Sequence, residues 1–393
     1  MSPRELQASF SLASIFGLRL FGMFIILPVF RLWAEGRPGW TLTLVGIALG
    51  AYGLTQAVLQ VPFGWLSDRH GRKPVLYFGL AVFAAGSLIC AVAETPWAVI
   101  GGRIVQGAGA VSGVVIAAAA DLTRESQRTK AMAIIGSTIG AVFAISFVAA
   151  PFLQATIGVP GIFAMTGALA AAAIVVVAWA VPEAAESHPS RPVHFGAVLR
   201  DPELARLNVG IFVLHAVLMA LFVVVPHALV EAGLPARSHW WVYLTAVGAG
   251  FVLMLPAILG RARARERAIF LASIAIVALG IAVLAAGLGS LGGIIGALVI
   301  FFAAFNVLEA KLPALVSRAA PREATGSATG VYSSVQFLGT FFGGAAGGFV
   351  AQHGGSLAVL AVCLVATMLW LAAAWNMGDF VARGGQVTSG IEP

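Results

Sequence analysis

Apolar residues fall in long uninterrupted runs along this chain, and proline, glycine and charged residues mark the boundaries between the runs. A helix needs about 20 apolar residues to cross a bilayer, whereas a strand of an outer-membrane barrel alternates over about 10. The runs therefore predict membrane-spanning helices. We place twelve of them, at residues 10–33, 41–66, 75–94, 97–120, 131–154, 161–181, 207–230, 239–260, 268–288, 291–316, 328–351 and 356–377.

The composition points to the same class, an all-α membrane protein. Of the 393 residues, 60% are apolar and 10% are charged, and the mean hydropathy is +0.97. A soluble domain carries about 25% charged residues, so a soluble globule is excluded. The run from Phe10 to Phe30 is too long for the core of a signal peptide, and we expect it to remain as the first span. Cys90 and Cys363 lie inside apolar runs without metal-site spacing, and we expect no metal.

The basic residues are distributed unevenly between the two faces of the predicted bundle. One set of termini and connections holds 17 of the 23, the opposite set holds 3, and the spans hold the other 3. Because cytoplasmic loops are enriched in Lys and Arg, both termini are predicted to lie in the cytoplasm. The basic run from Arg261 to Arg267 fits this bias, and a patch for anionic lipid is the alternative. The net charge of +7 therefore requires no nucleic-acid partner.

The longest connection divides the chain into two similar halves. We predict an N-terminal six-helix bundle at 1–181, a cytoplasmic linker at 182–206, a C-terminal six-helix bundle at 207–377 and a short cytoplasmic tail at 378–393. A shift of 197 residues aligns the fifth span with the eleventh, and a shift of 194 aligns Pro62 with Pro256. Repeats of this kind place a binding site at their interface near the bilayer midplane. Glycines spaced by four in the eleventh span predict that this helix packs closely against another. The two helices either slide along each other during function or form a static contact.

A polar segment, GWLSDRHGRK, joins the second and third spans. We expect Gly64 to permit close helix approach and Gly71 to permit a tight turn. Asp68 can accept hydrogen bonds from Arg72 or from a helix N-terminus. An acid at a membrane-embedded helix end is costly without such a role. The alternative is a solvated basic loop that includes Arg69 and Lys73.

The fourth span carries GGRIVQGAGA, in which Arg103 and Gln106 share a helix face. A buried guanidinium is expensive, so Arg103 is expected to line a cavity or to pair with an acid. The alternative is that its side chain extends to the outer headgroups.

These two segments resemble signatures of the major facilitator superfamily, and the second resembles that of its drug and proton antiporter branch. The likeness to one bacterial exporter of this family covers nearly the whole chain, and that exporter's soluble C-terminal domain is expected to be absent. The resemblance implies two six-helix bundles that rock about a central site, and export of the substrate. It also implies that Asp121 joins the loop residues in a cytoplasmic charge network, and the alternative is an ordinary charge at a helix end.

Glu309 is the acid that we place deep inside a span, so it is the candidate proton carrier. We expect it to face Arg19 or Arg103 across a central cavity, with Asn306 nearby. A permanent structural ion pair is the alternative. Lys311 points to the other side of its helix and is expected to extend toward the cytoplasm. His215, at midspan, can titrate near neutral pH, although a lone buried histidine is more often only hydrogen-bonded.

The faces of the central spans predict an apolar cavity. We expect six residues to line it, namely Phe16, Met23, Phe212, Met219, Phe302 and Phe305. Such a surface suits amphipathic or drug-like molecules better than sugars. No phosphate-binding Gly-rich loop and no catalytic constellation is found, so we expect an ion gradient or the substrate gradient as the energy source, no cofactor and no enzymatic activity. The resemblance to the drug and proton antiporter branch implies that the gradient is one of protons. A proton-independent uniporter or metabolite exporter is the alternative, and we expect a monomer in the lipid bilayer.

Overall fold

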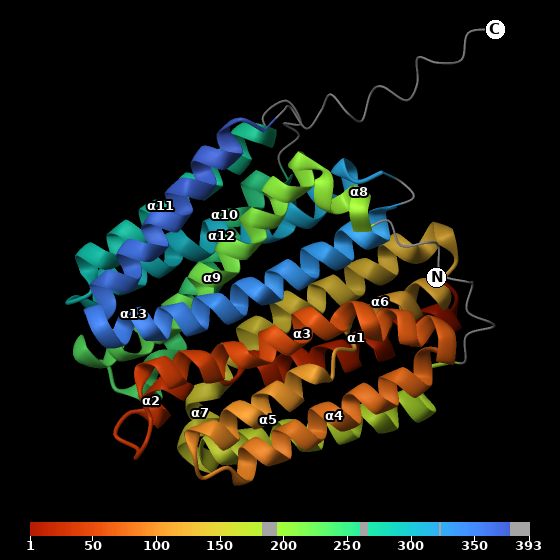
Figure 1. The fold of residues 1–393 in the computed structure, drawn as a ribbon, viewed down its shortest axis with the longest axis horizontal. Coiled ribbons are helices and arrows are strands. Elements are labelled where there is room, and N and C mark those ends of the chain that lie inside the picture. The colour runs from red at the N-terminus through yellow and green to blue at the C-terminus, as the bar shows by residue number, and fades with distance from the viewer. Residues whose placement is uncertain (183–194, 260–265, 322–323, 378–393) are drawn as a thin grey trace, which may run out of the picture.

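The computed structural model describes residues 1–182, 195–259, 266–321 and 324–377. Its regular elements there are helices, which lie side by side in a bundle (Figure 1). The N-terminal half contains α1 (Pro3–Phe24), α2 (Phe30–Ala34), α3 (Leu42–His70), α4 (Arg72–Val92), α5 (Pro96–Ala108), α6 (Ser112–Asp121) and α7 (Glu125–Trp179). The C-terminal half contains α8 (Phe195–Arg200), α9 (Pro202–Glu231), the 3-10 turn η1 (Ala236–Ser238), α10 (His239–Leu259), α11 (Glu266–Gly287), α12 (Leu291–Ala319) and α13 (Thr325–Trp375).

The predicted spans are confirmed, with α5 and α6 together forming one of them. Among the described residues, ten helical segments are long and apolar enough to cross a membrane. Two of these segments, α7 and α13, are long enough to contain two spans each. The 55 residues of α7 contain non-helical backbone at Gly158, and the 51 residues of α13 contain it at Gly355. Each therefore supplies two spans, as the sequence predicts for 131–154 with 161–181 and for 328–351 with 356–377.

The two turns are equivalent positions of an internal repeat. Gly158 has φ 67° and ψ 175°, and Gly355 has φ 74° and ψ −176°. This backbone conformation favours glycine, which has no Cβ to clash. The two residues are 197 positions apart, which is the shift that aligns the fifth span with the eleventh. The two six-helix halves remain our prediction for the domain division, and the matched turns agree with it.

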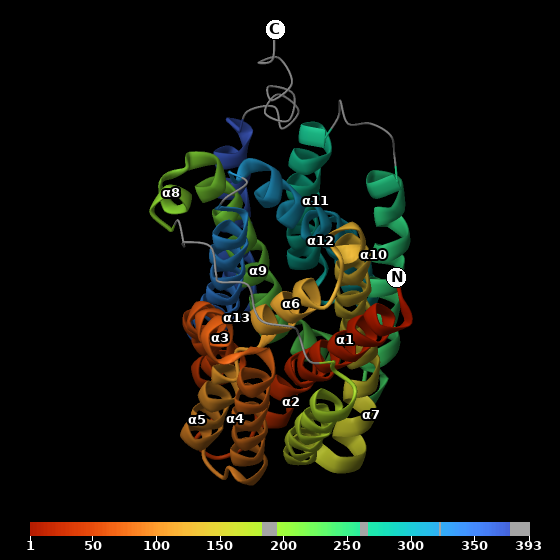
Figure 2. The same cartoon turned by 90° about the vertical axis from the view of Figure 1, so that its right-hand side faces the viewer.

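The two halves stack side by side, as Figure 2 shows with the red-to-yellow helices below the green-to-blue ones. At their interface, α3 packs on α13 through glycines. A Cβ added to Gly46 would lie 2.0 Å from the carbonyl oxygen of Gly344, and one added to Gly348 would lie 2.3 Å from the carbonyl oxygen of Leu42. The backbones are therefore in direct contact. Gly64 does not take part, because a Cβ there would meet nothing within 4 Å, so the close approach predicted at this position is wrong.

Several helix boundaries differ from the prediction. The first span, predicted at 10–33, is divided into α1, which ends at Phe24, and α2, which starts at Phe30. The fourth span is interrupted between α5 and α6, where Gly109 has φ −72° and ψ 52°. The seventh span, α9, starts at Pro202, inside the predicted linker, because Asp201 caps it by accepting from the backbone N–H groups of Glu203 and Leu204. The short helix α8 also lies within that predicted linker. Residues 261, 263 and 265 of the basic run and residues 378–393 of the predicted tail lie outside the described residues.

Candidate central site and gate

Arg19, on α1, lies in the interior of the N-terminal half. It is 2% exposed and donates hydrogen bonds to Ser112 on α6 and to Tyr52 and Gln56 on α3. The guanidinium carbon also lies 5.6 Å from the centre of the Tyr52 ring. Arg19 therefore joins three helices of one half through neutral groups.

Arg103, on α5, lies close to the same tyrosine. It is 1% exposed, and its guanidinium carbon lies 5.1 Å from the Tyr52 ring centre. It donates to Gln106 at 2.6 Å and to the carbonyl oxygens of Ala48 and Leu49 at 3.2 and 3.3 Å. The alternative in which Arg103 extends to the outer headgroups is wrong, because the side chain is held inside the bundle.

Glu309, on α12, forms a separate polar cluster in the C-terminal half. Its Oε1 accepts a hydrogen bond of 3.1 Å from the side-chain amide of Gln336 on α13. The same amide nitrogen lies 2.9 Å from Nε2 of His215 on α9, and that ring nitrogen is 3.9 Å from the Glu309 carboxylate. The Glu309 side chain is 32% exposed and the His215 side chain 12% exposed. This cluster contains an acid, an imidazole and an amide from three helices.

The predicted pairing of Glu309 with Arg19 or Arg103 is not present. The Glu309 carboxylate lies beside His215, and the ion pairs among the described residues include neither Arg19 nor Arg103. Lys311 lies 3.9 Å from Glu266 at the start of α11, so it is paired at the end of its span. Asn306 is 9% exposed, and its Nδ2 has no hydrogen-bond partner among the described residues. Gln336 was absent from the predicted site, although it is a polar residue in the middle of a span.

The contacts predicted between Asp68, Arg72 and Asp121 are present in the structure. Arg72, at the start of α4, lies between two acids: its Nε is 2.8 Å from Asp121 of α6, and its terminal nitrogen donates to Asp68 of α3. The same nitrogen donates to Ser67 at 2.6 Å. Gly71 has φ 89°, which confirms the predicted tight turn. One guanidinium thus connects α3, α4 and α6.

Arg69 and Lys73 complete the predicted loop set. The guanidinium of Arg69 lies 5.7 Å from the ring centre of Trp65, one turn back on α3. Lys73 is half-buried in the first turn of α4. Neither takes part in the contacts that Arg72 makes with the two acids.

The six predicted cavity residues occupy three different places. Phe16 is 7% exposed in the core of the N-terminal half, and Met23 packs beside Tyr52 and Phe83. Met219, Phe302 and Phe305 are at most 5% exposed in the core that both halves share. In that core the ring of Phe302 lies 5.9 Å from the ring of Phe143 on α7, so aromatic rings join the two halves.

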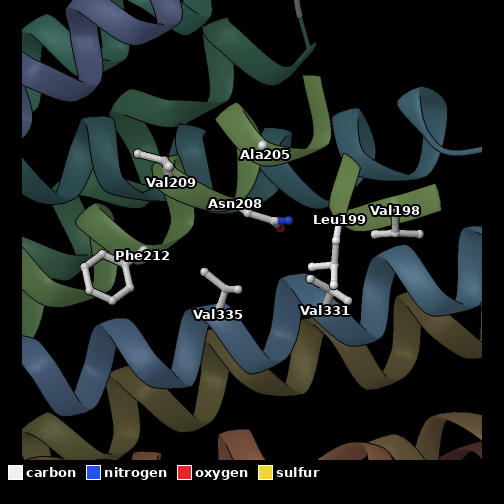
Figure 3. A pocket seen from close by; sticks show the side chains of 8 residues that line it. All are labelled: Val198, Leu199, Ala205, Asn208, Val209, Phe212, Val331 and Val335. Carbon is white, nitrogen blue, oxygen red and sulfur yellow. The ribbon is translucent and has the colours of Figure 1, made fainter. Parts of the chain in front are cut away.

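Phe212 lies in a groove between α8, α9 and α13 instead of in the shared core (Figure 3). The groove has a volume of about 330 Å³ and is lined by Val198, Leu199, Ala205, Asn208, Val209, Phe212, Val331 and Val335. Leu199 and Val209 are 65% and 47% exposed, and the ring of Phe212 lies 5.9 Å from that of Phe342, which is 50% exposed. Phe212 therefore lies in this groove and not in the core that contains Met219, Phe302 and Phe305, and its place in a central cavity stays a prediction.

Polar contacts between the halves gather at the end of the bundle opposite the N-terminus. Arg31 of α2 donates to the carbonyl oxygen of Val223 on α9 and pairs with Glu35 at 2.9 Å. Glu35 in turn lies 3.0 Å from Nδ1 of His227 on α9. Thr43 of α3 donates to Gln352 of α13 at 2.7 Å. These contacts close this end of the interface.

Comparisons with known proteins agree with this architecture. A model of the Major Facilitator Superfamily matches residues 12–344. The inner membrane transport protein YajR of Escherichia coli (strain K12) is 40% identical over 386 residues, which cover 96% of this chain and 85% of YajR. The multidrug resistance protein MdtH of Klebsiella pneumoniae (ATCC 700721) is 27% identical over 84% of this chain and 82% of MdtH.

A solved structure shows the same fold at low sequence identity. The inward-facing, occupied form of a bacterial homologue of the human lysosomal transporter Spinster superimposes with a TM-score of 0.75 at 14% identity, over 98% of this chain and 97% of that one. The family match covers most of the chain and the fold agrees, so this chain is a multi-pass membrane protein that belongs to the Major Facilitator Superfamily of transporters.

Proposed function

We propose that this chain exports small amphipathic molecules in exchange for protons, by alternating access of a site between its two halves. Membership in a transporter family supports the general activity. The distant relatives that are named for multidrug and tetracycline resistance support export of drug-like molecules. We further propose that it works as a monomer, without a bound cofactor, in the bacterial inner membrane.

The state of Glu309 is the observation that carries the proton-coupling proposal. A carboxylate in a spanning helix is expensive unless it is paired, protonated or functional. Glu309 has no guanidinium partner among the described residues, and a third of its side chain is exposed. It can therefore gain and lose a proton without breaking a buried ion pair. Gln336 and His215 hold the carboxylate in place from two other helices.

The polar contacts between the halves, at the end of the bundle opposite the N-terminus, bear on which conformation the structure represents. If the termini are cytoplasmic, as the basic residues predict, the contacts at Arg31, Glu35 and Thr43 close the opposite, outer side. The structure then corresponds to an inward-facing state. Alternating access requires these contacts to break while others form at the cytoplasmic side.

The test is proton flux in liposomes that contain the purified protein. Internal pH is followed while lipophilic cations, neutral drugs and organic anions are added under an imposed proton gradient. We expect substrate-triggered proton movement in the wild type and its loss in Glu309→Gln, with Glu94→Gln as the control because Glu94 is an exposed acid between α4 and α5. Substrate flux without proton movement would support the uniporter instead. Intact proton movement in Glu309→Gln would remove Glu309 as the carrier.

A further inference from the structure

The fourth span is broken beside a buried arginine. The helix α5 ends at Ala108 and α6 starts at Ser112, so the backbone between them is not helical at membrane depth. Non-helical backbone is tolerated there when it is buried in protein or lines a cavity. The first N–H groups of α6, a helix of 10 residues, face this break with the positive end of the helix dipole. The guanidinium of Arg19 points at the same place, because it donates to the hydroxyl of Ser112.

The positive charge at this break is not balanced within the described residues. Arg19 and Arg103 are 2% and 1% exposed, and a guanidinium stays protonated even when it is buried. Their hydrogen-bond partners are hydroxyls, side-chain amides and backbone carbonyls, and the ion pairs of the described residues include neither arginine. The Nε of Arg19 has no partner there at all. Two such charges, 5.6 and 5.1 Å from the centre of one tyrosine ring, are costly without an anion.

We infer that the break between α5 and α6 is an anion site, in which Arg19 and the N-terminus of α6 bind a carboxylate of the transported molecule. This inference rests on the proposed transport function and names its substrate class as organic anions. The carboxylate replaces Ser112, Tyr52 and Gln56 as the acceptor for Arg19. Arg103 stays bound to the carbonyl oxygens of Ala48 and Leu49 and adds positive potential from beside the Tyr52 ring.

The side chains around the anion site indicate what the part of the ligand other than its carboxylate should be. Tyr52 packs edge-on to Phe83, with ring centres 6.4 Å apart, and Met23 and Ala170 lie against the same cluster. Aromatic and thioether side chains favour an apolar ring over a polar chain. The ligand class is therefore an aromatic or aliphatic body with one carboxylate.

The test is a binding measurement on the purified full-length protein in detergent, with no gradient. The probes are 2-naphthoate and its neutral amide, 2-naphthamide, followed by equilibrium dialysis. We expect the carboxylate to bind about tenfold tighter than the amide, because a charge-assisted hydrogen bond replaces a neutral one. Arg19→Gln is expected to abolish this preference. Arg37→Gln, which changes an exposed arginine in the loop between α2 and α3, is the control. Equal binding of the two probes to the wild type overturns the inference.

A second variant tests the site without removing the arginine. Ser112→Asp places a carboxylate beside Arg19, so we expect a higher unfolding temperature together with loss of the preference for naphthoate. A purely structural arginine predicts the same gain in stability and no change in binding. Naphthoate binding to Ser112→Asp at the wild-type level therefore also overturns the inference.

Glu309→Gln separates this inference from the proposed function. We expect that variant to keep the preference for naphthoate, because it leaves the N-terminal half unchanged. If the wild-type protein shows the preference for naphthoate but moves no protons in liposomes, the antiport mechanism is wrong and the anion site stands. If protons move but the preference is absent, the site is wrong and the antiport mechanism stands.

Discussion

Arg72 illustrates how much a single side chain contributes to the charge network that joins α3, α4 and α6. Its planar guanidinium reaches Asp121 through Nε and Asp68 and Ser67 through a terminal nitrogen. A lysine has one charged nitrogen and cannot hold three acceptors on two helices in this geometry. Charge is therefore not sufficient here, and the shape of the donor group matters.

We expect Arg72→Lys to weaken the connection between α3, α4 and α6 and to slow transport. The loss of one or two charge-assisted hydrogen bonds corresponds to about 1.5–3 kcal/mol, or roughly tenfold or more in a conformational equilibrium. The measurement is the initial transport rate in liposomes. Arg128→Lys is the control, because Arg128 is exposed and makes one bond of 3.2 Å to the carbonyl oxygen of Ala120. An unchanged rate in Arg72→Lys would show that the network does not limit transport.

The sequence identified most of the individual site residues and fewer of their partners. Asp68 and Arg72 could be grouped because they lie four residues apart in one short loop, and the resemblance to the family added Asp121. Arg19, Arg103 and Glu309 lie on separate helices. The spacing of residues along a helix predicts which side of that helix a side chain occupies, but not which other helix packs against that side. The predicted pairing of Glu309 with Arg19 or Arg103 was therefore wrong. Gln336 was missed for the same reason.

At the level of helices, glycine decides where the two halves touch. The contact of α3 with α13 brings backbone against backbone at Gly46 and Gly344. The sequence predicted close packing of the eleventh span from its glycine spacing. The partner helix could not be predicted, because the second span carries glycines both at this contact and at Gly64, which faces open space.

We expect Gly46→Ala to prevent the two halves from closing fully at this contact. The new methyl carbon would overlap the carbonyl oxygen of Gly344, and overpacking costs about 1–3 kcal/mol, which corresponds to roughly tenfold in the population of the closed form. The measurement is the cross-linking yield between Thr43→Cys and Gln352→Cys with a short bifunctional reagent. The native Cys90 and Cys363 are buried and are expected to react slowly.

Gly248→Ala is the matched control for this prediction, because a Cβ at this position of α10 would meet nothing within 4 Å. The cross-linking yield is expected to stay at the wild-type level in this variant. If Gly46→Ala also gives the wild-type yield, the helices separate slightly at no cost and the glycine contact does not control closure.

The break between α5 and α6 is the element that sequence reasoning did not find. Residues 97–120 form one apolar run of spanning length, and glycines are common in membrane helices, so the run predicted a continuous helix. The structure shows why the glycines are there. A Cβ on Gly107 would lie 2.2 Å from the carbonyl oxygen of Tyr52, and one on Gly109 would lie 2.4 Å from that of Gly79. The chain bends where two neighbouring helices come closest.

Across the whole molecule, a group of polar contacts holds the two halves together at the end opposite the N-terminus. Glu35 accepts from Arg31 within its own half and lies beside His227 of the other half, and His227 is also 3.2 Å from Glu231. The side chains of Glu35 and His227 are about one-third exposed, so solvent weakens the interaction between them. Several such contacts together can be broken and remade during a transport cycle.

We expect Glu35→Gln to shift the balance toward the form that is open at this end. A partly exposed ion pair contributes about 0.2–1 kcal/mol, so the ratio of closed to open molecules should fall by about one-and-a-half- to fivefold. The same Thr43→Cys and Gln352→Cys cross-link measures this ratio. The control is Glu94→Gln, an exposed acid outside the contact. A yield that does not fall in Glu35→Gln would indicate that apolar packing alone holds this end closed.

The number and order of the spans could be predicted because each span must be long and apolar enough to cross the bilayer. The shape of the interface could not, since a transporter has at least two arrangements of the same helices and the sequence specifies both.

The two glycine turns in α7 and α13 have a consequence for synthesis of the protein. Residues 131–179 and 325–375 contain no Asp, Glu, Lys or Arg, and each of these segments crosses and returns with one glycine at the reversal. The second helix of each pair therefore has no flanking charge at the turn to set its direction in the translocon. Each pair is expected to enter the bilayer as a preformed helical hairpin, oriented by the basic residues before it.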